Sequence, residues 1–211
     1  MAEQTDKKNT KKYYDHISVA ARTTQLAHFV LPHDKPAMLE QIIKNSPEKK
    51  IIIITKSKRS ADELSSYLKS KNITALSIHG NHRAEQQVDA AKAFNEGGIN
   101  ILITTDMILK VLELNTIDKI ISYDLPVEPN DYYARVLYVD ERGESISLVS
   151  PEDEKLLVSI EFLMKVEMIE EEVKDFVPST EDVPKLVKDK KKKPRHAKKR
   201  ANKSRKKTPE E

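Results

Sequence analysis

The sequence predicts one α/β domain, in which a single parallel sheet is flanked by helices. Short β-branched runs alternate with helical patterns along the middle of the chain, as in a sheet built from strand–helix units. Residues 51–55 form a continuous apolar run, which is typical of a strand buried on both faces. The 211 residues suffice for one well-buried domain with extensions and are too few for two full α/β domains.

The strands are expected at six places along the chain: residues 26–31, 51–55, 74–78, 100–103, 117–123 and 145–149. Helices are expected between them at residues 35–44, 60–71 and 84–95, with Pro36 tolerated in the first helical turn. The later two helices each have an apolar face, formed by Ala61, Leu64 and Leu68 and by Val88, Ala91 and Phe94 respectively.

A last helix is expected to start at Pro151. Residues 152–182 hold 11 acidic residues against three lysines. An apolar stripe persists within them at Leu156, Leu157, Ile160, Leu163 and Met164. The pattern predicts an amphipathic helix with an acidic outer face over residues 152–175.

The net charge of +3 conceals two chemically different regions. Residues 185–207 contain 14 lysines and arginines and one acid, Asp189, for a charge of +13, whereas residues 1–184 carry −8. So dense a block of like charge repels itself and is expected to be disordered. We therefore expect an N-terminal extension at 1–21, a folded domain at 22–178, and a linker with a disordered basic C-terminal tail at 179–211.

Several functional classes are disfavoured by what the sequence lacks. No apolar run approaches the roughly 20 residues that span a bilayer, the N-terminus has no secretory pattern, and cysteine is absent. The four glycines (Gly80, Gly97, Gly98 and Gly143) cannot form a phosphate-binding loop. His79 and His82 are too few for a metal site. We expect a cytoplasmic protein with no membrane partner, metal or cofactor.

Four spaced segments carry a family resemblance: IIIITKSKRSADEL, IHGNHRAEQQVDAAKAF, ILITTDMILKVLEL and IISYDLPVEPNDYYARVLYVDERGE. They resemble motifs IV, IVa, V and VI of the second, C-terminal RecA-like domain of DEAD-box RNA helicases. The resemblance covers about residues 22–178. It implies a RecA-like fold and an RNA-related function, with the N-terminal ATP-binding domain of the family missing.

The chain departs from the family most clearly in motif VI. The family pattern HRxGRxxR falls on residues 134–141, where only Arg135 of three arginines survives. Tyr138 and Glu141 stand where the family has arginines that neutralise charge on the transferred phosphate, a contribution of roughly 10³ to 10⁵ in rate. The resemblance therefore implies that this chain has no ATPase or helicase activity on its own.

Motifs V and IVa are altered as well. In motif V the pattern TDxxxRGxD falls on residues 105–113, where Lys110 replaces the arginine, Val111 the glycine and Glu113 the final aspartate. In motif IVa, Ala84 and Gln87 stand in place of Q-x-x-R, which removes a phosphate-contacting arginine. We interpret Lys110, Glu113, Arg135, Tyr138 and Glu141 as positions of a degenerate nucleotide site.

Several positions on the RNA side of the family domain persist here, and we predict RNA contacts at Ser57, Lys58, Arg59, Gly80, Thr105 and Asp106. The alternative interpretation is purely structural. Gly80 would then serve a tight turn, and Thr105 and Asp106 would cap a helix.

The basic tail has three interpretations: nucleic-acid binding, solubilisation, or attraction to anionic membrane. Arginines interleaved with lysines favour phosphate contact, and the lack of aromatic residues argues against base stacking. The tail residues predicted to bind RNA are Lys191, Lys192, Lys193, Arg195, Lys198, Lys199, Arg200 and Arg205.

Together these features predict an RNA-binding protein without ATPase or unwinding activity, with ribosomal RNA or a ribonucleoprotein as its setting. One alternative is the second lobe of a two-chain ATP-dependent RNA helicase, paired with a separate ATP-binding lobe. The other is a protein-interaction module that uses the acidic helix.

Overall fold

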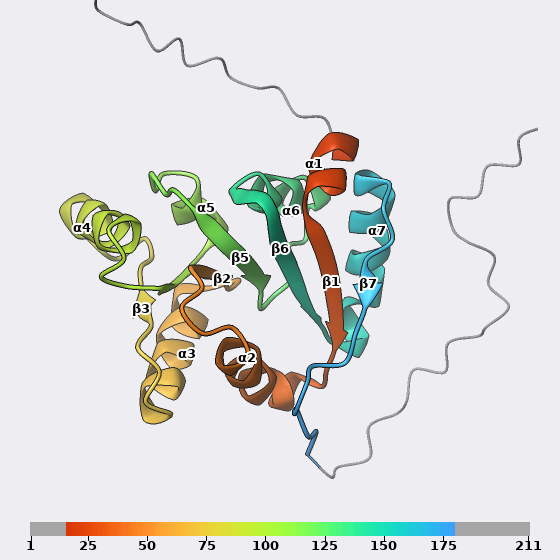
Figure 1. Ribbon diagram of the computed structural model, residues 1–211, viewed down its shortest axis with the longest axis horizontal. Helices are drawn as coiled ribbons and strands as arrows, with labels where there is room; N and C mark the ends of the chain where they lie inside the picture. The colour runs from red at the N-terminus through yellow and green to blue at the C-terminus, as the bar shows by residue number, and fades with distance from the viewer. Residues whose placement is uncertain (1–15, 180–211) are drawn as a thin grey trace, which may run out of the picture.

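A computed structural model describes residues 16–179 of the protein as one seven-stranded parallel sheet between two layers of helices (Figure 1). The strand order is β3-β4-β2-β5-β6-β1-β7, and every pairing is parallel. The strands are β1 (Thr24–Phe29), β2 (Ile51–Ile54), β3 (Leu76–Ser77), β4 (Ile101–Thr104), β5 (Ile117–Ser122), β6 (Val139–Val149) and β7 (Ile169–Glu170). This is the predicted fold class.

Helices connect the strands on both faces of the sheet. They are α1 (His16–Arg22), α2 (Lys35–Lys44), α3 (Lys58–Ser70), α4 (Ala84–Asn95), α5 (Asp106–Leu109), α6 (Pro129–Val136) and α7 (Glu154–Met164), with short 3-10 turns η1 (Pro32–Asp34) and η2 (Pro151–Asp153). The side chains of α2 and α3 pack on one face, and those of α1, α4, α5, α6 and α7 pack on the other. None of these helices is long and apolar enough to cross a membrane.

The central strand β2 shows why an unbroken isoleucine run is needed. Ile51 and Ile53 face the cluster beneath α2 and α3, while Ile52 and Ile54 face the cluster beneath α4 and α5. Side chains of a strand alternate between faces, so a strand covered on both sides must be apolar throughout. All four isoleucines are buried.

Helix α4 begins and ends where the sequence predicts, and two of its three predicted core residues, Ala91 and Phe94, are buried. Val88, also expected in the core, is 66% exposed. Ala90 packs against the sheet in its place. The prediction for Val88 was wrong because a helix with small apolar residues has more than one face that fits a helical period.

The long acidic helix predicted for residues 152–175 was also wrong. Helix α7 ends at Met164, where Lys165 adopts a left-handed conformation with φ of 56°. The chain then returns to the sheet, and β7 pairs with β1 at its edge. Glu161 is buried and accepts a hydrogen bond from the Met168 backbone N–H at 3.1 Å, so this acid stabilises the end of the helix.

At the N-terminus, helix α1 lies within the segment expected to be an extension. Val19 of this helix is fully buried in the cluster formed with α6 and α7. Part of residues 1–21 therefore packs with the domain.

Candidate nucleic-acid interface

Three of the predicted RNA contacts follow the carboxyl ends of three neighbouring strands, β2, β4 and β3. The Thr55 N–H donates to the Thr104 carbonyl at 2.9 Å, and the Ile78 N–H donates to the Ile103 carbonyl at 2.9 Å. Parallel pairing therefore brings Ser57, Gly80 and Thr105 to one edge of the sheet, although they are distant in the sequence. We call the ends of β2, β3 and β4 the open edge.

The N-terminus of α3 gives the open edge a positive character. Ser57 caps the helix, because its Oγ accepts from the Ser60 N–H at 3.1 Å. Lys58 and Arg59 follow, both exposed; the Lys58 Nζ donates to the Asn81 Oδ1 at 3.0 Å and Arg59 pairs with Glu63 at 2.8 Å. A helix N-terminus with two cations at the surface suits a phosphate group.

Gly80 is not required by the fold. It is exposed, its φ is not positive, and a Cβ built there would meet no atom within 4 Å. The interpretation that folding needs a glycine at this turn was wrong, since a Cβ is accommodated without contact. A glycine at this position leaves the backbone accessible to a close ligand.

Thr105 and Asp106 do not cap α5 through their side chains. Thr105 occupies the N-cap position but makes no side-chain cap hydrogen bond. The Asp106 carboxylate instead receives two hydrogen bonds from Arg135, from Nε to Oδ1 and from Nη2 to Oδ2, both at 2.7 Å. The capping interpretation was therefore wrong, and both carboxylate oxygens of Asp106 are engaged within the domain.

Arg135 is the one arginine that remains of motif VI, and it is buried. Only 1% of its surface is exposed. Besides its pair with Asp106, its Nη1 donates to the Ser122 Oγ and to the Asp124 carbonyl, each at 2.8 Å. A bidentate pair with further hydrogen bonds is the arrangement in which a buried charge is tolerated. This guanidinium therefore has no free face for a phosphate.

The other described degenerate positions offer no free cation to a phosphate. The Tyr138 ring packs against the cluster around α4 and α5, and burial raises the pKa of its hydroxyl. The Lys110 Nζ lies 2.9 Å from the Asp131 Oδ1, and hydrogen bonding to this carboxylate raises the lysine pKa. Glu113 is exposed, and its carbonyl accepts from the Asn95 side chain at 2.8 Å. We call the Arg135–Tyr138 region with α5 and α6 the closed edge.

Two other substitutions are accommodated at the closed edge. Val111 is 63% exposed and does not have positive φ, so replacing the family glycine causes no backbone strain. Glu141 lies on β6, and its side chain is outside the described part of the structure. The predicted RNA-binding residues of the tail, from Lys191 to Arg205, also lie outside the described residues.

The ionic pair between Asp106 and Arg135 was not foreseen. The two residues are 29 positions apart, and no local pattern joins them. His79 is likewise buried, with its Nε2 3.0 Å from both carboxylate oxygens of Asp62. Within residues 16–179, no group of three or more metal-ligating side chains could hold a metal ion.

The parallel sheet, its strand order and the strand-end loops define a RecA-like α/β domain. Residues 34–137 match the family described as the helicase conserved C-terminal domain. Over these residues the chain is therefore similar to helicase C-terminal domains, and the relatives that it matches are ATP-dependent RNA helicases, among them DEAD-box proteins.

Individual relatives agree with this assignment. The chain is 30% identical over 145 residues to the probable ATP-dependent RNA helicase ddx41 of Dictyostelium discoideum, covering 67% of this chain and 22% of that protein. It is 32% identical over 151 residues to the ATP-dependent RNA helicase SUB2 of Eremothecium gossypii, covering 70% and 34% respectively. The chain thus spans about a third or less of these relatives.

Solved structures show the same fold. A DEAD box protein from Methanococcus jannaschii superposes with a TM-score of 0.68 at 27% identity, covering 72% of this chain and 43% of that chain. Dbp5 of Saccharomyces cerevisiae, bound to RNA and ADP BeF3, superposes with a TM-score of 0.70 at 22% identity, covering 77% and 45%.

Proposed function

We propose that this domain binds RNA and neither hydrolyses ATP nor unwinds RNA by itself. The basic tail supplies most of the affinity, and the open edge places the protein on the RNA. Ribosomal RNA or a ribonucleoprotein is the proposed setting, consistent with a relative of Candida glabrata that is an rRNA helicase, 33% identical over 128 residues.

The observation that carries the proposal is the state of the closed edge. Arg135 is held by Asp106, Ser122 and the Asp124 carbonyl, and Tyr138 presents a partly buried ring. Stabilisation of phosphoryl transfer needs a cation aimed at the transferred group. Among the described side chains of motif VI, residues 134–141, Arg135 is the only cation. Arg142 lies on β6, one residue past the motif's last arginine position, and has positive φ.

The open edge supports the RNA part of the proposal. It keeps two exposed cations at a helix N-terminus and a glycine that folding does not require. Backbone N–H groups and cations of this kind position a nucleic-acid backbone without reading its sequence. The tail, with a charge of +13 over residues 185–207, adds a larger electrostatic contribution.

A second candidate function is the second lobe of a two-chain helicase. The fold supports it, since the domain superposes on less than half of two longer helicase-type chains, 43% and 45% of their lengths. The closed edge argues against a two-chain helicase, because its cations Arg135 and Lys110 are paired with carboxylates of the same domain. The third candidate, a protein-interaction module built on the acidic helix, loses support because that helix ends at Met164.

ATP hydrolysis by the purified chain tests the proposal. We expect phosphate release at the background level, with or without a single-stranded RNA, and the same result for the double variant Tyr138→Arg with Glu141→Arg. Two arginines cannot replace a missing phosphate-binding loop. RNA-stimulated turnover that survives further purification would overturn the proposal.

A further inference from the structure

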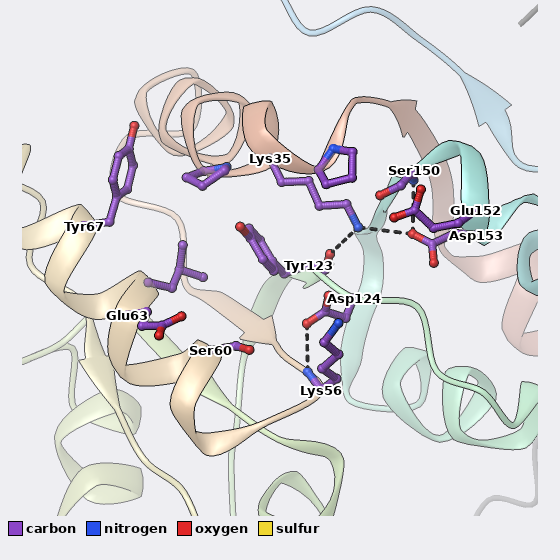
Figure 2. Close-up of a pocket in the computed structure, with 13 residues that line it drawn as sticks. Lys35, Lys56, Ser60, Glu63, Tyr67, Tyr123, Asp124, Ser150, Glu152 and Asp153 are labelled. Carbon is purple, nitrogen blue, oxygen red and sulfur yellow. Dashed lines mark hydrogen bonds and ion pairs between the residues drawn. The ribbon is translucent and has the colours of Figure 1, made fainter. Parts of the chain in front are cut away.

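A pocket of about 390 Å³ lies at the carboxyl ends of β2, β5 and β6, between α2 and α3 (Figure 2). Ser60, Glu63 and Tyr67 of α3 form one wall, and Glu152 and Asp153 form the opposite wall. Helix α3 follows β2 on one face of the sheet and α6 follows β5 on the other. Parallel α/β sheets bind ligands at such switch points. Ser57, Gly80 and Thr105 of the open edge do not line this pocket.

The charged groups of the pocket leave negative charge uncompensated. Lys35 is 5% exposed, and its Nζ lies 3.2 Å from both the Asp153 Oδ2 and the Tyr123 carbonyl, so Asp153 matches its charge. Glu63 pairs with Arg59 at 2.8 Å, and both of these side chains are exposed. The lining then holds Asp124 and Glu152 against one cation, Lys56, and Glu152 makes no ion pair within residues 16–179. Such a pocket repels phosphate and attracts a cation.

The uncharged part of the pocket suits a long basic side chain. Tyr67, Tyr123 and Pro36 present apolar surface between the carboxylates. Burial raises the pKa of Tyr67 to about 12 and raises the pKa of Tyr123 further, so both rings are neutral. Lysine and arginine place their methylene stems on such surfaces while the charged end stays near carboxylates and water, and tyrosine faces attract cations.

The described chain ends beside this pocket. The Ser179 N–H and hydroxyl both donate to the Asp34 Oδ2, each at 3.1 Å, and Asp34 immediately precedes the pocket residue Lys35. Lys190 follows Ser179 by eleven residues, a stretch that spans at most about 36 to 40 Å. The basic block can therefore reach the pocket, and attachment this short gives a local concentration on the order of millimolar.

We propose that this pocket is a docking site for the chain's own basic tail, and that Lys and Arg side chains of residues 190–200 occupy it when RNA is absent. Three observations favour this occupant. The pocket has an excess of carboxylates, it has apolar walls, and Ser179, the last described residue, is bound to Asp34 beside it. RNA, with its higher charge density, displaces the tail from the pocket. While it is docked, the tail has a lower apparent affinity for weakly charged competitors, but RNA can still bind to it.

Zero-length carbodiimide crosslinking of the full-length chain, followed by mass spectrometry, tests this without RNA and therefore independently of the proposed function. We expect amide links within one molecule between tail lysines and Glu63, Asp124 or Glu152. In the variant Glu63→Gln with Asp124→Asn and Glu152→Gln, links from the tail to the remaining carboxylates around the pocket should fall about tenfold, since the negative charge that attracts the tail is removed. The control Glu85→Gln with Asp89→Asn and Glu96→Gln, on α4 and its C-cap across the sheet, removes equal charge and should leave the links intact.

Thermal unfolding of the three proteins verifies that each is folded. A second measurement uses salt, since roughly 1 M salt shortens the screening length to about 3 Å and should abolish the links. Tail links that are spread over exposed acids in proportion to their exposure would overturn the proposal. Links found only between two molecules, or a loss that is equal in the pocket and control variants, would overturn it as well.

Discussion

The open and closed edges are two halves of the same line of strand ends, and they differ in what their polar groups contact. At the open edge, Lys58 and Arg59 are exposed and Gly80 leaves its backbone accessible. At the closed edge, Arg135 and Asp106 satisfy each other, and Tyr138 joins the core. A polar group that is fully bonded within the protein stabilises the fold, whereas one that faces water is available to a ligand. The comparison indicates which polar groups of this domain remain open to a ligand.

The largest effect on stability is expected from substitution of Arg135, the buried arginine of the closed edge. Replacing it with alanine removes a buried guanidinium and leaves the partly exposed Asp106 carboxylate, the Ser122 hydroxyl and the Asp124 carbonyl without their donor, and we expect the free energy of unfolding to fall by about 1 to 3 kcal/mol. Urea unfolding followed by circular dichroism measures this change. Lys110→Ala, which removes an exposed cation of the same edge, is the control and should leave stability nearly unchanged. Similar losses in both variants would mean that Arg135 is not a structural residue.

Removing the tail tests how much RNA binding the open edge supports alone. A chain that ends at Pro184 should bind single-stranded RNA at least about 100-fold more weakly at moderate salt, because most phosphate contacts are lost. With about six to eight tail cations on phosphates, log K against log salt should have a slope of roughly −4 to −6 in the full chain and a much flatter one after truncation. Fluorescence anisotropy at several salt concentrations measures both. Near-intact affinity after truncation would place the main RNA site on the domain.

Substitution of Gly143 should lower stability, whereas substitution of Gly80 should leave it nearly unchanged. A Cβ on Gly143 would collide with the Val139 side chain and lie 2.8 Å from the Asp118 carbonyl, so Gly143→Ala should cost about 1 to 3 kcal/mol of stability. Gly80→Ala meets no atom and should change stability by less than about 0.5 kcal/mol. Thermal melts of the two variants compare them directly. A large loss for Gly80→Ala would contradict our interpretation of the open edge.

Lys58 and Arg59 are expected to give the smallest effect. The double alanine variant should reduce the salt slope of RNA binding by about 1 to 2, since each cation contributes at most about one phosphate contact. Stability should be nearly unchanged. Lys155→Ala, an exposed cation on α7, is the matched control for lost charge. If the control reduces the slope as much, the open edge makes no specific contact with RNA.

The sequence determined the fold class and the chemical limits of the site. Unbroken isoleucine runs and helical periods depend only on neighbouring residues, so they placed β2, β4, β5, α2 and α4 closely. The replacement of motif VI arginines by Tyr138 and Glu141 followed from the resemblance to the family motif. Strand β3 and the end of α7 were placed less well, because strand pairing and a left-handed helix end are set by more distant contacts.

Tertiary structure alone decided which polar groups remain available to a ligand. Asp106 matches a motif whose side chain the sequence assigns equally well to RNA or to a cap, yet Arg135, 29 residues later, takes both its oxygens. Val88 fits the helical period but lies on the solvent side of α4. The physical reason is common to both: periodicity and spacing specify the direction of a side chain along its own element, and only packing specifies what it meets.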